Sequence, residues 1–269
     1  MSELHFHQPQ GGVLFVGAHP DDETVMAGGI LALLHERNIP THLICVTDGR
    51  GGESGGVPEA DTPDARATVR KAELLCAAEA LGLTSVTLLG YIDPIMGPDD
   101  ELFGFDADEA TVAQQIVDVI HDRGVSVVLS HGTDGEYGHP AHKQVNRIVT
   151  HVVHALTPDV LHYTVMAAIP SVEDRLLNAS DPAHLALDIM PWIEQKHAAY
   201  LCHHTQHALF KRRRKLTDVR DAVRLHESVR RQWPETPGHP DDWFARALID
   251  GGAVRIDQPE QHTEQTSES

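Results

Sequence analysis

The chain has 269 residues, 41% hydrophobic and 23% charged, and a formal net charge of -19 with histidine neutral. This length can bury one sizeable core, and the negative charge argues against nucleic acid or an anionic membrane surface as the main partner. No apolar run is long enough to cross a bilayer, and the first residues lack the pattern of a signal peptide. We therefore expect a cytoplasmic protein.

Short apolar runs alternate with stretches of helical spacing along most of the chain. The apolar runs predict strands at 13–17, 42–47, 85–89, 125–130 and 160–165. The stretches of helical spacing predict helices at 25–36, 65–81, 108–122, 141–155, 191–210 and 217–232. Strands that alternate with helices predict an α/β fold with a Rossmann-like, mostly parallel sheet, helices on both faces and C-terminal helical additions.

The organisation along the chain is simple. We expect one domain over residues 1–257, with the Rossmann-like core at about 12–165. Residues 258–269 are polar with few apolar side chains, so we expect a disordered tail there. The sequence leaves the oligomeric state open, including a homo-oligomer.

The three cysteines are Cys45, Cys76 and Cys202, which lie far apart and form no CxxC pair. An odd and dispersed set argues against a disulfide framework. Cys45 falls in an apolar strand-like run and Cys76 in a helical one, so we expect both side chains to be buried.

Ligands of a parallel sheet bind beyond the carboxyl ends of its strands. Four loops follow predicted strands and are rich in Gly, Asp, Glu or His; they are residues 17–24, 48–63, 90–105 and 131–140. We therefore expect all four loops to face one crevice.

The first loop contains His19-Pro20-Asp21-Asp22 at the start of a predicted helix. His19 and Asp22 are three residues apart, a spacing that can aim both side chains at one point. Imidazole and carboxylate groups are good ligands for zinc. Asp21 is adjacent to a ligand and should point elsewhere, so it is a candidate general base.

The last loop contains His139-Pro140-Ala141-His142, two histidines three residues apart at another helix start. His19, Asp22 and one of these histidines would form a three-ligand site with a position left for water, as catalytic zinc requires. The remaining histidine could stabilise the oxyanion that forms when an amide carbonyl is attacked. The residues thus predict a zinc-dependent amide hydrolase.

The two motifs together resemble the PIG-L/LmbE family of metal-dependent N-deacetylases, over roughly residues 12–206. The resemblance implies a hydrolase that removes an N-acetyl group from an N-acetylglucosamine-type substrate, a small N-acetylated sugar or glycoconjugate. It implies Zn²⁺ as cofactor, with Fe²⁺ or another divalent metal left open.

The resemblance also assigns roles residue by residue. The metal ligands would be His19, Asp22 and His142; the general base would be Asp21; the acid or oxyanion stabiliser would be His139. The substrate-binding residues would be Arg70, Asp93 and Tyr137.

The chain departs from the family pattern at Ala141, where the family usually has an aspartate between the two histidines. That aspartate would orient the preceding histidine and raise its pKa. Asp134 and Glu136 are candidates to supply the missing carboxylate.

Three other functions remain open. The same metal site could cleave a thiol S-conjugate or another N-acylated amine. His19, Asp22 and His142 could instead form a facial triad that binds Fe²⁺ for oxygen chemistry. The chain could also be a non-catalytic α/β binding module. The intact set of candidate ligands argues against this hypothesis.

Overall fold

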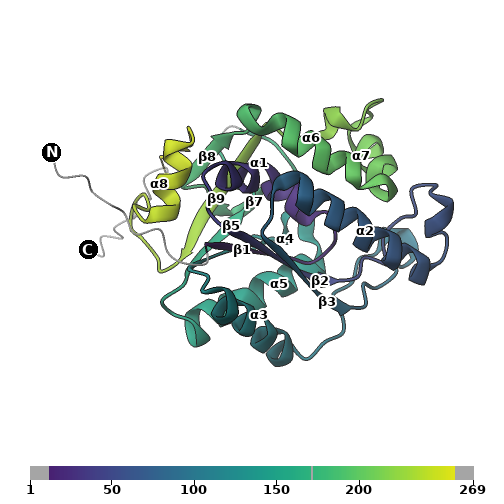
Figure 1. Cartoon of the computed structure of the whole chain (residues 1–269), viewed down its shortest axis with the longest axis horizontal. Coiled ribbons are helices and arrows are strands. Elements are labelled where there is room, and N and C mark those ends of the chain that lie inside the picture. Colours follow the sequence, from purple (N-terminus) through teal and green to yellow (C-terminus); the bar gives the residue numbers. More distant parts are fainter. Residues whose placement is uncertain (1–11, 171, 258–269) are drawn as a thin grey trace, which may run out of the picture.

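The computed structural model describes residues 12–170 and 172–257 and contains an eight-stranded sheet with the order β10-β8-β9-β5-β4-β1-β2-β3 (Figure 1). Five neighbouring strands are parallel: β1 (Val13–Gly17), β2 (Thr41–Thr47), β3 (Ser85–Tyr91), β4 (Val127–Ser130) and β5 (Leu161–Val165). Three further strands continue the sheet antiparallel: β9 (His226–Trp233), β8 (Leu185–Asp188) and β10 (Val254–Arg255). The predicted α/β fold with a mostly parallel sheet is confirmed.

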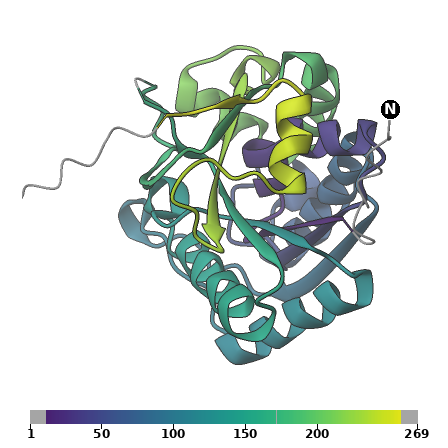
Figure 2. The ribbon, with the colours of Figure 1, turned by 90° about the vertical axis from the view of Figure 1, so that its left-hand side faces the viewer.

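Helices cover both faces of this sheet (Figure 1). One layer contains α1 (Asp22–Glu36), α2 (Pro63–Leu81), α6 (Ile193–Cys202), α7 (His207–Arg214) and α8 (Trp243–Asp250). The other contains α3 (Glu109–Arg123) and α5 (Pro140–His151). Figure 2 shows α8, in yellow, beside the strands that the C-terminal part adds. The short helix α4 (Gly135–Gly138) and the paired strands β6 (Ala167–Ala168) and β7 (Asn178–Pro182) complete the described elements that concern the site.

The period of two along the strands divides the apolar residues between two cores. In β1, Val13 and Phe15 pack with α1, α2 and α6, whereas Leu14 and Val16 pack with α3 and α5. Because both faces are covered, the central strands are buried throughout and read as continuous apolar runs. This is why the sequence pattern located them.

Two predictions for the C-terminal part are wrong. The second half of the helix expected at 217–232 is strand β9 from His226 on, because pairing with β5 and β8 holds it extended. The helix expected at 191–210 ends at Cys202 and resumes at His207, because His203 has a non-helical backbone, with φ −85° and ψ 61°. The C-terminal additions are therefore strands as well as helices.

The cysteines also differ from expectation. Cys45 is buried and free, as predicted. Cys76 is exposed and forms a disulfide with Cys202, with the two Cα atoms 5.7 Å apart. The sequence argued against this bond because 126 residues separate the two cysteines, and only the packing of α2 against α6 brings them together.

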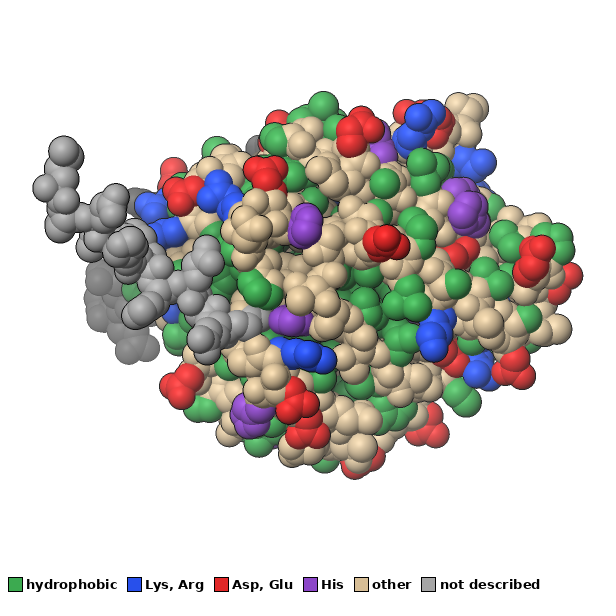
Figure 3. Space-filling view, in the orientation of Figure 1, with side chains coloured by type: hydrophobic (Ala, Val, Ile, Leu, Met, Phe, Trp, Pro, Cys, Tyr) green, Lys and Arg blue, Asp and Glu red, His purple; other side chains and the backbone are tan. Residues whose placement is uncertain are grey.

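Charged side chains are dispersed on the face drawn in Figure 3, where the coloured Lys and Arg side chains lie among Asp and Glu. Within residues 12–170 and 172–257, no helix is both long and apolar enough to cross a membrane. The expected tail at 258–269 lies outside the described residues.

Candidate metal centre and active site

A crevice of about 420 Å³ lies at the carboxyl ends of the parallel strands. Residues from all four predicted loops line it, including Asp21, Gly52, Asp93 and His139. The prediction that these loops face one crevice is confirmed. The crevice also has apolar walls, to which Met26 and Phe210 contribute.

The turn between β1 and α1 holds His19 and Asp22 together. The backbone N–H of His19 donates to Asp22 Oδ2 at 2.7 Å, and the N–H of Asp22 donates to the carbonyl oxygen of His19 at 3.3 Å. Both side chains are almost fully buried. The spacing of three residues therefore does what the sequence predicted, since the two side chains approach each other.

The second histidine pair comes from the start of α5. His139 is the N-cap, and its Nδ1 accepts the backbone N–H of Ala141 at 3.2 Å. Pro140 occupies the first turn, where its missing N–H costs nothing. The His139 and His142 rings stack with centroids 4.5 Å apart, so both reach the crevice from one helix end.

The three predicted ligand residues lie close together, with His19 and His142 each approaching a different oxygen of Asp22. His19 Nδ1 lies 3.2 Å from His142 Nε2 and 3.6 Å from Asp22 Oδ2, and His142 Nε2 lies 3.5 Å from Asp22 Oδ1. Ligand atoms at zinc bond lengths of about 2.0–2.1 Å in a tetrahedron are about 3.3–3.4 Å apart. The spacing, the burial and the donor types therefore fit a metal ion.

The electrostatics favour a cation at the same place. Burial alone would lower the pKa of His19, but the carboxylates of Asp93 and Asp22 outweigh it and raise that pKa to about 10. Burial would likewise raise the pKa of Asp22, but His142 and His131 hold it well below its usual range. The site thus stabilises positive charge, which a metal ion would supply.

Asp21 points away from the ligands toward Arg70. Its φ of 149° and ψ of −15° are values that residues with a side chain rarely adopt. Asp21 Oδ1 lies 3.3 Å from Arg70 Nη2. Burial raises the pKa of Asp21 to about 6, although Arg70 opposes the shift. A carboxylate with such a pKa in a crevice suits a general base.

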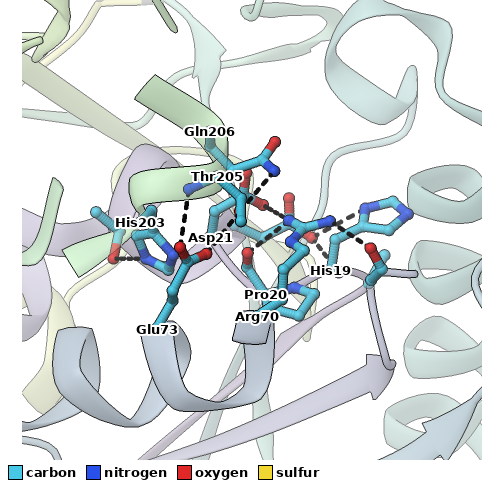
Figure 4. A network of polar contacts seen from close by, with 12 residues as sticks. His19, Pro20, Asp21, Arg70, Glu73, His203, Thr205 and Gln206 are labelled. Carbon is cyan, nitrogen blue, oxygen red and sulfur yellow. Dashed lines mark hydrogen bonds and ion pairs between the residues drawn. The ribbon is translucent and has the colours of Figure 1, made fainter. Parts of the chain in front are cut away.

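Arg70 lines the crevice, but its donors are directed at the protein (Figure 4). Nη2 donates to the carbonyl oxygen of Pro20 at 2.7 Å, and Nη1 donates to that of Gly49 at 3.0 Å. The residue is 3% exposed. Arg70 therefore holds the Asp21 turn, a contact that the family resemblance did not imply.

The other two predicted substrate-binding residues also line the crevice. Asp93 Oδ1 lies 3.4 Å from His19 Nε2, so Asp93 orients a predicted ligand as well as facing the crevice. Tyr137 is half-buried, and the guanidinium carbon of Arg175 lies 5.5 Å from its ring centroid. Tyr137 and Arg175 together form one wall of the crevice.

Neither carboxylate considered from the sequence, Asp134 or Glu136, takes the place of the aspartate that Ala141 replaces. Asp134 accepts hydrogen bonds from Ser180, and Glu136 contacts His142 and His131. The bond to His139 Nδ1 comes instead from the backbone of Ala141.

The sequence pattern did not single out His131, which directly follows β4. Its Nε2 lies 3.1 Å from Asp22 Oδ2. Among the described residues, two groups have ligand atoms that all lie within 4.8 Å of one another: Asp22, His131 and His142, and His19, His139 and His142. Its Nδ1 is bonded to Glu136, and its Nε2 also lies 3.0 Å from the backbone nitrogen of Ala18. The only signal in the sequence was its place at a strand end.

A further polar layer joins α2 to the segment after α6 (Figure 4). Glu73 accepts the backbone N–H of Thr205 at 2.8 Å and its hydroxyl at 2.6 Å. His203 Nε2 lies 3.4 Å from Glu23 Oε1, next to the predicted ligand Asp22. This layer packs the C-terminal half of the chain against the turn that holds the site.

Comparison with known proteins identifies relatives. Residues 14–153 match the family described as PIG-L: GlcNAc-PI de-N-acetylase. A 1D-myo-inositol 2-acetamido-2-deoxy-alpha-D-glucopyranoside deacetylase from Acidothermus cellulolyticus is 34% identical over 171 residues, 59% of this chain and 58% of that protein. The deacetylase of the same description from Mycobacterium sp. (strain KMS) is 33% identical over 226 residues, 72% of this chain and 73% of that protein. The match thus spans less than two thirds of the first relative's length.

Among solved structures, GalB, a 4-carboxy-2-hydroxymuconate hydratase from Pseudomonas putida KT2440, has a TM-score of 0.59. It is 22% identical, and the match covers 86% of this chain and 99% of that one. At this identity the likeness shows the fold alone. The reaction has to be argued from the residues of the site.

Proposed function

Because the chain belongs to the PIG-L family of GlcNAc-PI de-N-acetylases, we propose that it is a zinc-dependent hydrolase that removes an N-acetyl group from an N-acetylglucosamine-type molecule. The observation that carries the proposal is the approach of His19 Nδ1 and His142 Nε2, which lie 3.2 Å apart and 3.6 Å and 3.5 Å from the two different oxygens of Asp22. Asp21 and His139 flank these atoms in one crevice.

His19, Asp22 and His142 would hold the metal. Zinc bound by three protein ligands lowers the pKa of a water molecule to about 7 and polarises a carbonyl group. Two nitrogens and one carboxylate are a typical donor set for catalytic zinc, although the same set also binds Fe²⁺.

Two residues of the chain would handle the protons and the charge. A carboxylate oxygen of Asp21 accepts the proton of the attacking water and is held in place by Arg70. The Ala141 N–H bonds to Nδ1 of His139, so the neutral ring carries its proton on Nε2. That Nε2–H is free to donate to the oxygen that becomes negative when the amide is attacked.

The substrate would lie between the metal and the outer crevice. Asp93 and Tyr137 can offer polar contacts to sugar hydroxyls, and the apolar wall near Met26 and Phe210 can accept the rest of the molecule. The two related deacetylases are described as acting on a 1D-myo-inositol 2-acetamido-2-deoxy-alpha-D-glucopyranoside, which supports an acetamido sugar here. An amidase that acts on a thiol S-conjugate or another N-acylated amine is the alternative.

The decisive experiment is acetate release by zinc-loaded protein from a panel of substrates. The panel includes N-acetylglucosaminyl-inositol, free N-acetylglucosamine, and an N-acylated amine without a sugar. We expect acetate from the sugars and loss of activity after chelation or in His142→Ala. Zinc-loaded protein that cleaves only the non-sugar amide would establish the amidase alternative, and protein that cleaves none would contradict the proposal.

A further inference from the structure

Glu136 is a buried carboxylate beside the metal centre, and the mechanism above gives it no role. Glu136 is 4% exposed. Oε2 accepts from His142 Nδ1 at 2.6 Å and from His131 Nδ1 at 3.0 Å. Oε1 accepts from the backbone N–H of Gly132 at 3.0 Å and from Asn178 Nδ2 at 3.2 Å.

All four of these partners can donate, so the group between them must be an acceptor on both oxygens. An ionised carboxylate satisfies this requirement, whereas an amide would turn its NH₂ toward two donors. The site is therefore built for Glu at position 136 and against its isosteric amide. This distinguishes Glu136 from a side chain that merely fills space.

The backbone at Glu136 has an unfavourable conformation. Its φ of 56° and ψ of −90° lie near the rare γ-turn region, which glycine tolerates and other residues do not. Asn178 holds this conformation, because its Oδ1 accepts the backbone N–H of Glu136 at 2.9 Å. Strain of this kind persists where the surroundings over-determine it, and it is concentrated at functional sites.

Glu136 contacts one predicted metal ligand, His142. His142 donates from Nδ1, so its Nε2 has a free lone pair where it faces His19 and Asp22. His131 is bonded to the same carboxylate oxygen, and its Nε2, which accepts the backbone N–H of Ala18, lies 3.1 Å from Asp22 Oδ2. One carboxylate thus orients both His142 and the histidine that lies beside Asp22.

We propose that Glu136 is a positioning residue of the metal centre, which fixes the tautomer and orientation of His142 and orients His131 beside Asp22. The inference rests on the proposed function only in taking His19, Asp22 and His142 as the metal ligands. The chain lacks the family's aspartate at position 141, and the carboxylate that contacts a histidine of the second motif comes from Glu136.

The test is zinc affinity in the absence of substrate, measured by competition with a chromophoric chelator. Glu136→Gly removes the carboxylate and relieves the backbone strain, but it leaves four buried donors without their acceptor, so the zinc-free variant should melt below the wild-type temperature. Zinc affinity is therefore measured at a temperature at which the zinc-free variant is folded, and we expect it to fall about 10–100-fold, the usual effect of removing a carboxylate behind a histidine ligand. A purely structural role predicts an unchanged zinc affinity in the folded variant.

Two further variants complete the design. Glu136→Gln keeps the volume and should also weaken zinc binding, because its NH₂ meets two donors. Asp181→Asn is the matched control, since Asp181 is a buried acceptor of bonds from Thr133 and Gln232 that does not touch a ligand. Its zinc affinity should equal that of the wild type. If Glu136→Gln and Glu136→Gly both bind zinc within about threefold of wild type, the proposal is overturned.

Nitrogen-15 spectra of the histidine rings give a second readout that does not depend on stability. In zinc-free wild-type protein, His142 should carry its proton on Nδ1, and in Glu136→Gln this preference should be lost. An unchanged tautomer in the variant would contradict the proposal. If zinc binding depends on Glu136 but the protein releases no acetate, this inference stands and the proposed function fails. If the protein releases acetate but zinc binding does not depend on Glu136, the proposed function stands and this inference fails.

Discussion

Arg70 Nη2 donates to the carbonyl oxygen of Pro20 at 2.7 Å, across a separation of 50 residues (Figure 4). The same nitrogen lies 3.3 Å from Asp21 Oδ1, and Nη1 bonds to Gly49. The guanidinium therefore bridges three points of two loops at the strand ends. A planar fork of donors can do this, and a single ammonium group cannot.

The first prediction concerns Arg70→Lys in the zinc-loaded enzyme. Lysine keeps the charge but cannot bridge Pro20 and Gly49 together, so the Asp21 turn should shift. We expect kcat to fall about 100-fold, the effect of a misplacement of about 1 Å, with a smaller change in KM. Steady-state kinetics would check this, with Arg66→Lys on the same helix as control, since Arg66 bonds only the more distant Arg50 carbonyl. A raised KM at unchanged kcat would instead support the sugar-binding role.

The second prediction concerns the proposed base. Asp21→Asn preserves shape but removes the proton acceptor, so kcat should fall about 10²–10⁴-fold. Zinc affinity should stay at the wild-type value, because Asp21 points away from the three ligand atoms. The control is Asp64→Asn, which neutralises an exposed carboxylate. Full activity in Asp21→Asn would refute the assignment, and lost zinc binding would show that Asp21 acts on the metal.

The sequence predicted the parallel core because its signals are local. The apolar run of β1 and the stop of α2 at Gly82, which has φ 74°, are each decided by residues close in the chain. Strand β9 could not be predicted in this way. Its sequence is mostly polar, with Val229 and Trp233 as its apolar residues, and its partners β5 and β8 are distant in sequence.

The same division holds at the site. His19 and Asp22 could be assigned because a three-residue spacing in one turn brings them together. The contact of Glu136 with His142 could not be predicted, because it depends on a positive φ at Glu136, which is rare for residues other than glycine. The bonds of Arg70 depend on packing between segments remote in the chain.

The third prediction concerns the Cys76–Cys202 disulfide, which joins α2 to α6 and closes a loop across 126 residues. Replacing both cysteines by serine should lower the free energy of unfolding by about 2–4 kcal/mol, because a long loop is freed in the unfolded chain. Denatured, unreduced protein should titrate one thiol, Cys45, and reduced protein three. Three thiols without reductant would show that the bond is not formed. Disulfides are rare in the cytosol, so a formed bond would argue against the expected cytoplasmic location.

The fourth prediction concerns pH. His162 in β5 is fully buried, with Nε2 2.8 Å from Ser130 Oγ, and burial lowers its pKa from 6.5 to about 3. The unfolded chain therefore binds a proton between about pH 6.5 and 3 that the folded protein does not, so stability falls as pH falls through this window. From pH 7 to pH 5 this group should remove about 2 kcal/mol from the free energy of unfolding. In urea titrations His162→Gln should show a shallower decline than wild type, whereas the exposed His121→Gln should not. Parallel curves for wild type and His162→Gln would mean that His162 is protonated in the folded protein.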